Sequence, residues 1–520
     1  MIIRTLVISV LSVYAFTLTL RHNLHMLQLN GYKNDEHLRW LKKNIRQQWL
    51  LIFGLCSGIV RLFFPYLIFD ILIIFDLVMV ILVYRALMRL NNKKKLVYTA
   101  RVKRLIFTLV VLSLLIIFAV FRIFGIKGIS AAAVIAVSLE LILDIAANII
   151  NHPVEEGINR YYINDARRIL KSMPELITIG VTGSYGKTSV KYYLETLLKT
   201  RYDVLVTPGN FNTPLGITRT IREHMKPGNE IFICEMGARR TGEIKEICDL
   251  FPPDHGIITA VGPQHLETFF SMENIRKTKF ELADAVSGKG MLFLNGDNDI
   301  IRETAGKYPD PILYFSNGKR EGYYAKDIKV SDLGTSFAVV TPEGEEESFH
   351  VRLIGAHNII NVLGAIAVAN KLGISLRELK VPVRRIEPVE HRMQIRNQGN
   401  VTIIDDAYNS NPVGSKAAVE TLGLFDGVKI LITPGMVELG DREWEYNRKF
   451  GNYAAENCDY IFLVGKNHTK AIMDGIMEKK FPEERSRVFD RVEDAMSFAL
   501  GIRDDRRKII LLENDLPDNY

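Results

Sequence analysis

Hydrophobic residues follow two different patterns along the 520-residue chain. Up to about residue 151 they form long and nearly unbroken runs, whereas from Glu175 onward short apolar runs alternate with stretches of helical spacing. Unbroken runs of about 20 residues are typical of membrane spans. Short strands that alternate with amphipathic helices are typical of parallel sheets with crossover helices. The pattern therefore predicts a helical transmembrane region, residues 1–151, followed by α/β domains.

The transmembrane region contains a series of apolar runs. They cover residues 6–20, 50–64, 65–83, 105–121 and 129–150. The run at 50–64 is short and contains Arg61, so we expect four or five membrane helices. No small-residue cleavage site follows the first run, which argues against a signal peptide.

Basic residues concentrate between the first and second runs and again before the fourth run. Lys and Arg are enriched on the cytoplasmic side of membrane helices. With five spans, both basic segments and everything after Ile150 fall inside the cell, where ATP is available. This topology accounts for much of the net charge of +7, so nucleic acid is not an expected partner. The four cysteines are scattered and predict neither a disulfide framework nor a zinc site.

Four carboxylates interrupt the apolar runs, namely Asp70, Asp76, Glu140 and Asp144. A charged side chain inside a membrane is costly, and such residues often mark a path for a polar ligand. They can equally face neighbouring helices or lie near the membrane interface. The sequence leaves both interpretations open.

The segment VTGSYGKTSV, which begins at Val181, has the pattern of a phosphate-binding loop between a strand and a helix. Glycines let backbone amides approach phosphate oxygens, and a helix amino terminus favours an anion. Lys187 can reach the β- and γ-phosphates, and Thr188 can bind Mg²⁺. The usual pattern has its first glycine where this chain has Val181. We predict that ATP is bound by Gly183, Ser184, Gly186, Lys187, Thr188 and Ser189.

TGSYGKTS resembles the phosphate loop of the Mur ligase family, ATP-dependent enzymes that add amino acids or dipeptides to peptidoglycan precursors. Further motifs follow in the order of that family over residues 175–464: TPGNFNTPLGI, EMGARRTGEI, GPQHLETF, KTKFELADA, LNGDND, GAHNIINVLGAIAVA, EHRM, DDAYNSNP and GMVELG. NFNTPLG, EMGA, DDAYNSNP and GMVELG are most similar to the branch that adds D-alanyl-D-alanine. The resemblance implies a linker (152–174), a central ATP-binding domain with a P-loop-type parallel sheet (175–389) and a smaller Rossmann-like carboxyl-terminal domain (390–520).

The resemblance also implies the roles of individual residues. Glu235, at the end of the strand IFICE, would hold Mg²⁺ together with Thr188, and His265 would bind a second Mg²⁺. Lys279 matches a family lysine that is commonly carbamylated, which gives it an anionic end for Mg²⁺. Without the resemblance, Lys279 is best interpreted as a solvated lysine and His265 as a structural residue. The implied catalytic residues are Lys187, Lys279, His265 and Arg392, and the further nucleotide contacts are Asn295, His357, Asn358, Asn361, Arg392 and Asp405 or its neighbour Asp406.

The predicted function is a membrane-bound ligase that activates a carboxylate with ATP, as an acyl phosphate, for attack by an amine. The implied acceptor is a peptide-bearing cell-wall precursor, and the implied amine is D-alanyl-D-alanine. The membrane region stands where the related ligase has a UDP-binding domain, which favours a lipid-linked acceptor, whereas the family similarity favours a UDP-linked one. LLENDLPDNY and NRKFG depart from the family pattern and leave the amine open. The alternatives are poly-γ-glutamate synthesis and a nucleotide-binding membrane scaffold without chemistry.

Overall fold

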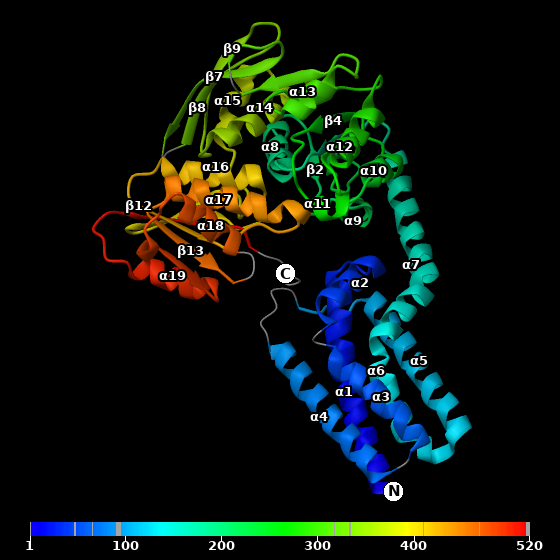
Figure 1. Cartoon of the computed structure of the whole chain (residues 1–520). Helices are drawn as coiled ribbons and strands as arrows, with labels where there is room; N and C mark the ends of the chain where they lie inside the picture. Colours follow the sequence, from blue (N-terminus) through cyan, green and yellow to red (C-terminus); the bar gives the residue numbers. More distant parts are fainter. Residues whose placement is uncertain are drawn as a thin grey trace. The chain divides into compact units, whose positions relative to one another are not determined.

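The computed structural model describes residues 2–45, 48–64, 66–89, 95–316, 318–331, 334–408, 410–466 and 469–515, without the side chains of Ile2, Arg89, Ala356 and His357. The chain divides into two compact units, residues 1–161 and 162–516 (Figure 1). The helix α7 (Glu140–Lys171) begins in the first unit and ends in the second.

The first unit is helical. Its helices are α1 (Ile2–Leu29), α2 (Asn34–Lys43), α3 (Trp49–Phe63), α4 (Leu67–Arg89), α5 (Ala100–Phe124), α6 (Ile129–Ser138) and the first part of α7. Three stretches, Ile3–Leu29, Leu67–Met88 and Ala100–Ser138, are long and apolar enough to cross a membrane, by length and composition alone. The third stretch contains both α5 and α6, and α3 has only 15 residues, so the number of spans stays a prediction.

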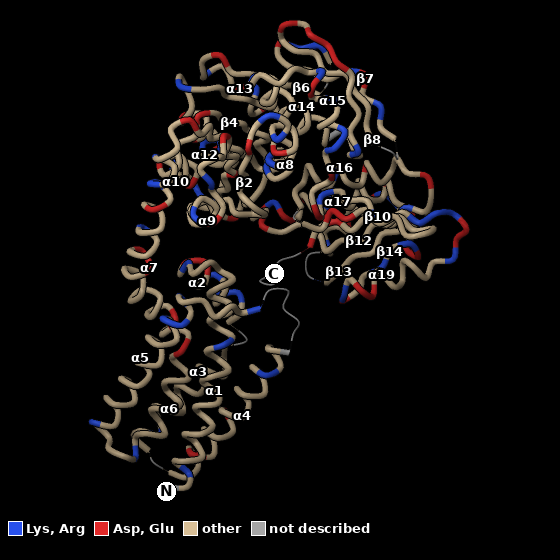
Figure 2. The backbone as a smooth tube through the Cα atoms, turned by 180° about the vertical axis from the view of Figure 1, so that it is seen from behind, with Lys and Arg blue, Asp and Glu red and all other residues tan. Residues whose placement is uncertain are grey.

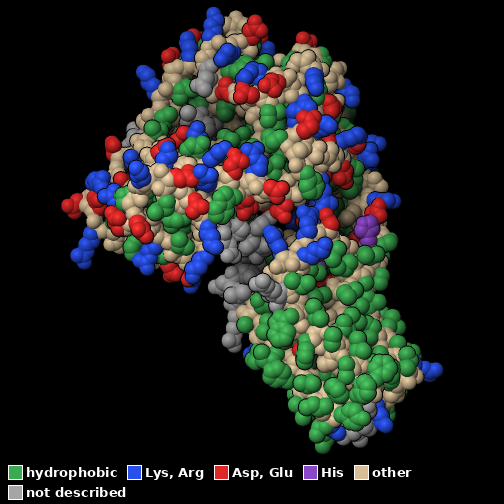
Figure 3. Space-filling model, viewed as in Figure 1, with side chains coloured by type: hydrophobic (Ala, Val, Ile, Leu, Met, Phe, Trp, Pro, Cys, Tyr) green, Lys and Arg blue, Asp and Glu red, His purple; other side chains and the backbone are tan. Residues whose placement is uncertain are grey.

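The surface of this unit fits a lipid environment. Apolar side chains cover the face seen in Figure 3, and charged residues are sparse along α1 and α3 to α6 in Figure 2. Exposed apolar residues such as Phe107, Phe118 and Ile123 are 60–74 % exposed. Soluble monomers rarely expose continuous apolar surface of this kind. The bundle therefore supports the predicted membrane association.

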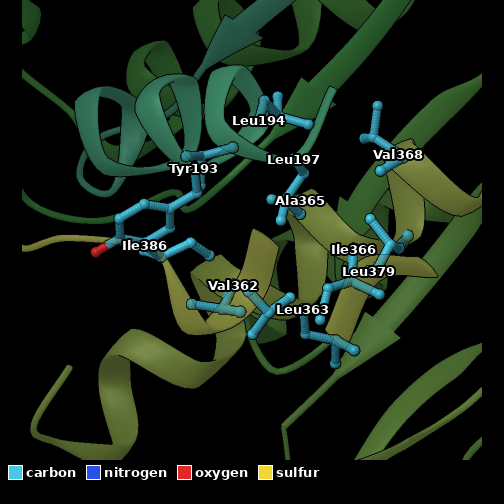
Figure 4. Packing of buried hydrophobic residues seen from close by; sticks show 14 of the residues in the cluster. Tyr193, Leu194, Leu197, Val362, Leu363, Ala365, Ile366, Val368, Leu379 and Ile386 are labelled. Atoms are coloured by element: carbon cyan, nitrogen blue, oxygen red, sulfur yellow. The ribbon is translucent and has the colours of Figure 1, made fainter. Parts of the chain in front are cut away.

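The second unit contains a nine-stranded sheet of order β2-β3-β1-β4-β5-β6-β7-β8-β9, parallel up to β7 and antiparallel beyond it. The strands are β1 (Ile177–Thr182), β2 (Val204–Val206), β3 (Ile231–Glu235), β4 (His255–Ile258), β5 (Leu292–Asn295), β6 (Ile312–Phe315), β7 (Tyr323–Ser331), β8 (Gly334–Val340) and β9 (Glu346–Val351). One face packs against α8 (Lys187–Leu198), α14 (Ala356–Lys371) and α15 (Leu376–Arg384). Figure 4 shows Leu194 and Leu197 of α8 beside Ala365 of α14.

The other face of this sheet packs against α9 (Pro214–His224), α10 (Glu243–Leu250), α12 (Met272–Val286) and α13 (Asp299–Ala305). The central strands β1 and β3 are almost completely buried, as expected for a parallel sheet with helices on both faces. Because β1, β3, β4 and β5 are parallel, their carboxyl ends meet at one edge of the sheet. Ligands of such sheets bind at this edge.

A second, six-stranded sheet has the order β10-β11-β15-β12-β13-β14, and only the β10–β11 pair is antiparallel. Its strands are β10 (Gln394–Gln398), β11 (Val401–Asp406), β12 (Val428–Thr433), β13 (Tyr460–Val464), β14 (Ser486–Phe489) and β15 (Lys508–Glu513). The helices α16 (Pro412–Gly423), α17 (Glu443–Asn457) and α18 (Lys470–Glu478) cover one face, and α19 (Val492–Gly501) covers the other. The predicted fold class, a helical region followed by two mostly parallel α/β sheets, is confirmed.

Candidate active site

The phosphate loop connects β1 to α8, and two of its glycines are required by the local geometry. Gly186 has φ 82°, and a Cβ there would lie 2.6 Å from the Asn361 side-chain oxygen. A Cβ on Gly183 would lie 2.1 Å from Thr259 Oγ1. The Ser184 amide donates to the Ala260 carbonyl at 2.7 Å, which fixes the loop against the end of β4. The loop is therefore a fixed cradle rather than a flexible turn.

Lys187 folds back over this cradle. Its Nζ donates to the carbonyl of Gly183 at 2.7 Å and to that of Ser184 at 3.1 Å. Burial lowers the pKa of Lys187 to about 8, although Glu235 opposes this shift; nearby Arg392 contributes to it. A phosphate group would supply the negative charge that restores an ordinary ammonium pKa. The role of Lys187 at a phosphate site stays a prediction with which this geometry is compatible.

Glu235 lies at the carboxyl end of β3, beside the first turn of α8. Its Oε1 accepts hydrogen bonds from Thr188 Oγ1 at 3.3 Å and from Asn212 Nδ2 at 3.1 Å, and its Oε2 lies 3.0 Å from Lys191 Nζ. Burial would raise the pKa of Glu235, but Lys191 and Lys187 outweigh it, so the pKa lies below its usual value. Glu235 is thus an ionised oxygen ligand beside a hydroxyl, a donor pair that fits Mg²⁺.

Lys191 is a residue of the site that the sequence did not predict. It is completely buried and is the ion-pair partner of Glu235. Its Nζ also donates to the carbonyl of Gly209 at 2.7 Å. The sequence signal was its position on α8, one turn after Lys187 and thus on the same helix face. Lys191 therefore joins the predicted metal ligand to the loop that precedes α9.

We expect Lys191→Met to lower the free energy of unfolding by about 3 kcal/mol, because Glu235 would remain as a buried charge without its ion pair. Chemical unfolding followed by circular dichroism would measure this loss. Adding Glu235→Gln to the variant should recover part of it, since the charge is then removed. Lys199→Met, at an exposed position of the same region, is the control. Unchanged stability of Lys191→Met would contradict the expectation.

His265 lies in the loop that follows β4 and has a left-handed backbone conformation, with φ 53°. Its Nδ1 contacts the Glu438 carboxylate, which is also 3.3 Å from Arg239. Burial lowers the pKa of His265 and Glu438 partly opposes the shift. With Nδ1 paired, Nε2 is the nitrogen left for a metal, an arrangement common among metal-binding histidines. Sequence reasoning singled out the motif GMVELG but not Glu438 itself.

Lys279 lies on α12 and is 2 % exposed, so its interpretation as a solvated lysine is wrong. It shares the buried face of the helix with Ile275, Leu282 and Val286. Burial, together with the positive charge of Lys187, lowers the pKa of Lys279 to about 7. A substantial fraction of the side chain is therefore a neutral amine near neutral pH.

A cavity of ≈ 260 Å³ lies between the phosphate loop and the second sheet. Its lining includes the predicted residues Gly186, Ser189, Asn295, Asn358, Asn361 and Arg392. The side-chain amides of Asn295 and Asn358 donate to backbone carbonyls, at 2.7 and 2.9 Å, so each also has a structural role. The side chain of His357 lies outside the described residues. The cavity has the position expected for a nucleotide beside a phosphate loop.

The structure separates the two aspartates of the DDAYNSNP motif. Asp406 lines the cavity, and burial raises its pKa to about 6 against the effect of Arg392. Asp405 is absent from the lining; its carboxylate accepts from His391 Nδ1 at 2.8 Å and lies 3.2 Å from Arg396. The geometry therefore favours Asp406 over Asp405 as the residue beside the nucleotide.

A second cavity, of ≈ 520 Å³, lies on the other side of Arg392. Its lining includes Thr188, Tyr192, Asn210 and Tyr408. Arg392 borders both cavities, and its guanidinium lies 4.4 Å from the ring centroid of Tyr408. The side chain of Arg392 thus lies where a group bound in one cavity would meet a group bound in the other.

The phosphate loop, the buried carboxylate and the two sheets define an α/β nucleotide-binding protein. Residues 181–369 match the Mur ligase middle domain, and residues 391–512 match the Mur ligase glutamate ligase domain. A relative from Buchnera aphidicola, a UDP-N-acetylmuramoyl-tripeptide–D-alanyl-D-alanine ligase, is 30 % identical over 322 residues, which cover 60 % of this chain and 70 % of the relative. The chain belongs to the Mur ligase family.

A further relative and two solved structures are also similar to this chain. The Bacillus subtilis ligase of the same name is 32 % identical over 55 % of this chain, and the chain spans 62 % of the length of that relative. The structure of MurF from Acinetobacter baumannii matches with a TM-score of 0.63 and 24 % identity, over 70 % of this chain and 78 % of that one. A MurF ligase from Thermotoga maritima in complex with ADP matches with a TM-score of 0.61 and 25 % identity, over 69 % and 80 %.

Proposed function

We propose that the chain is a membrane-bound, ATP-dependent amide ligase. The observation that carries the proposal is the contact of Thr188, next to the phosphate loop, with the buried Glu235, which pairs with the buried Lys191. A metal-bound triphosphate would be held at this place. Membership of the Mur ligase family supports the same activity, as does the ADP in the Thermotoga maritima structure. A protein that only binds nucleotide has no need for a buried, activated Lys279.

In the proposed reaction, the chain orients ATP and a carboxylate and neutralises the charge that develops between them. Lys187 would bind the γ-phosphate, and Thr188 with Glu235 would hold Mg²⁺, with His265 and a carbamylated Lys279 at a second ion. Bound Mg²⁺ supplies charge neutralisation for phosphoryl transfer. Arg392, between the two cavities, would contact the carboxylate or the phosphate that reaches it. The carboxylate would take the γ-phosphoryl group and release ADP, which gives an acyl phosphate. An amine would then displace phosphate from the acyl phosphate and lose a proton, and an amide forms.

The nucleotide is proposed to occupy the cavity of ≈ 260 Å³, with Asn295, Asn361 and Asp406 along its walls. The acceptor would then enter the cavity of ≈ 520 Å³, which reaches Thr188 from the opposite side. With the nucleotide and the acceptor in these two cavities, the γ-phosphate and the acceptor carboxylate would lie on the two sides of Arg392. The domain boundaries proposed for this arrangement are 175–389 and 390–520.

The apolar helices before the ligase domains support a location at the cell membrane, with the catalytic domains in the cytoplasm. Basic residues on the segments around α2 and before α5 favour this orientation. A peptide-bearing cell-wall precursor is the proposed acceptor, in its lipid-linked form because the membrane region would keep the domains close to such a lipid. The names of the relatives support D-alanyl-D-alanine as the amine.

The proposal is tested with purified full-length protein in detergent, ATP, Mg²⁺ and D-alanyl-D-alanine, with either a UDP-linked or a lipid-linked tripeptide. Phosphate release and the mass of the product are measured. We expect an amide product, and more of it from the lipid-linked acceptor. Replacing the dipeptide by glutamate tests poly-γ-glutamate synthesis. Tight ATP binding without phosphate release from any mixture would instead support a scaffold without chemistry.

A further inference from the structure

A cluster of polar side chains lies inside the helical unit, between α1 and α7. Asn23, Glu140 and Asp144 are all 0 % exposed. The amide nitrogen of Asn23 donates to Glu140 Oε2. Glu140 and Asp144 are four residues apart on one helix, so they lie on the same face. The cluster is therefore built from two helices that are distant in the sequence.

Most oxygen atoms of this cluster lack a donor. Asn23 Oδ1, Glu140 Oε1 and both carboxylate oxygens of Asp144 have no hydrogen-bond partner among the described residues. The carboxyl groups of Glu140 and Asp144 lie within hydrogen-bonding reach of each other, and the Thr19 side chain lies close to Glu140. Buried polar groups without partners are strongly unfavourable, and buried carboxylates more so. A metal cation or a shared proton would neutralise this cluster.

Asp70 provides a comparison within the same bundle. Its carboxylate is also buried, but it is 2.5 Å from Arg61 and 2.9 Å from Arg4. Arg61 and Arg4 thus neutralise the buried carboxylate of Asp70. Among the described residues, no Lys or Arg forms an ion pair with Glu140 or Asp144.

The backbone between α6 and α7 stays helical at the same place. The helix α6 ends at Ser138 and α7 begins at Glu140, but Leu139 between them has a right-handed helical conformation (φ −83°, ψ −4°). The Leu139 amide donates to the Ile135 carbonyl and the Leu143 amide to the Leu139 carbonyl, both at 2.9 Å. Glu140 and Asp144 are therefore held on a helix with ordinary backbone hydrogen bonds.

We propose that Asn23, Glu140 and Asp144 bind one small monovalent metal cation such as Na⁺. A single shared proton supplies one donor, which leaves the other acceptor oxygens unpaired, whereas a metal ion contacts several oxygens at once. When one of the two carboxyl groups keeps its proton, the cluster carries a single negative charge, which one monovalent cation neutralises and Mg²⁺ or Ca²⁺ does not. Na⁺ prefers oxygen ligands, and the two carboxyl groups and the Asn23 amide supply them.

The test is binding of radioactive sodium to the full-length chain in detergent, in a choline buffer free of other metal ions. We expect saturable binding of about one ion per chain. Asp144→Asn and Asn23→Leu should weaken it by at least about 10-fold, because each removes a ligand. Asp35→Asn, an acidic residue with a side chain 54 % exposed on α2, is the matched control and should bind as the unmodified chain does.

ATP hydrolysis by each variant reports whether the ligase domains are intact, independently of the ion site. Absence of sodium binding by the unmodified chain would overturn the proposal, whatever the variants do. Infrared spectra would then identify the alternative: a protonated-carboxyl band that Asp144→Asn removes would show that the two acids hold a proton. Sodium binding that Asp144→Asn and Asn23→Leu leave unchanged would overturn the assignment to these residues.

Discussion

Replacing Lys187 by alanine is expected to lower ATP turnover by about 10³-fold, the loss typical for removal of a group that stabilises a transferring phosphoryl group. The Lys187 ammonium donates to the Gly183 carbonyl of the phosphate loop at 2.7 Å. No second described lysine donates to this loop: Lys191 is held by Glu235 and Gly209. The measurement is the steady-state release of phosphate with saturating acceptor.

Lys199→Ala is the matched control, because this lysine belongs to the end of the same helical segment but pairs only with Glu195 at an exposed position. It should retain the unmodified rate. The fold should survive Lys187→Ala, since the loop is fixed by the Ser184 and Thr259 hydrogen bonds, which do not involve Lys187. Circular dichroism checks this point. Normal turnover in Lys187→Ala would refute the assignment of the whole site.

Local patterns predicted the parts of the site that depend on adjacent residues. The phosphate loop needs a strand, glycines and a helix in immediate succession, and all three were evident in the segment that begins at Val181. The burial of Lys279 could also have been predicted, because it lies four residues after Ile275 on a helix with apolar spacing. Its charge favoured the opposite interpretation, which was wrong.

Pairs between distant segments could not be predicted from one sequence. The contact of His265 with Glu438 joins residues 173 positions apart, and it exists because the loop that follows β4 meets the loop that follows β12. The choice between Asp405 and Asp406 depends on strand orientation, since neighbouring residues of a strand point to opposite faces. A motif that contains both aspartates carries no information on which one faces the cavity.

Lys279→Met should lower amide formation by about 10²-fold, because it removes the amine that is proposed to become a carbamate. A neutral amine attacks CO₂ and loses a proton, whereas the ammonium form does not react. Since burial places the Lys279 pKa at about 7, the amine is mostly neutral above this pH and mostly protonated below it. With limiting bicarbonate, activity should therefore fall as the pH decreases through about 7, and added bicarbonate should oppose this loss.

Lys277→Met is the matched control, because Lys277 lies on the same helix with a side chain that is 62 % exposed. It should keep both the rate and the bicarbonate dependence. Carbon-13 NMR with labelled bicarbonate gives a direct measurement: the unmodified chain and Lys277→Met should show a carbamate signal, and Lys279→Met should lack it. If Lys279→Met loses activity although the unmodified chain shows no carbamate, the buried amine itself acts in the site. In that case Lys279 would contribute a positive charge or a hydrogen-bond donor to the phosphate, and the second ion would have to be held without it.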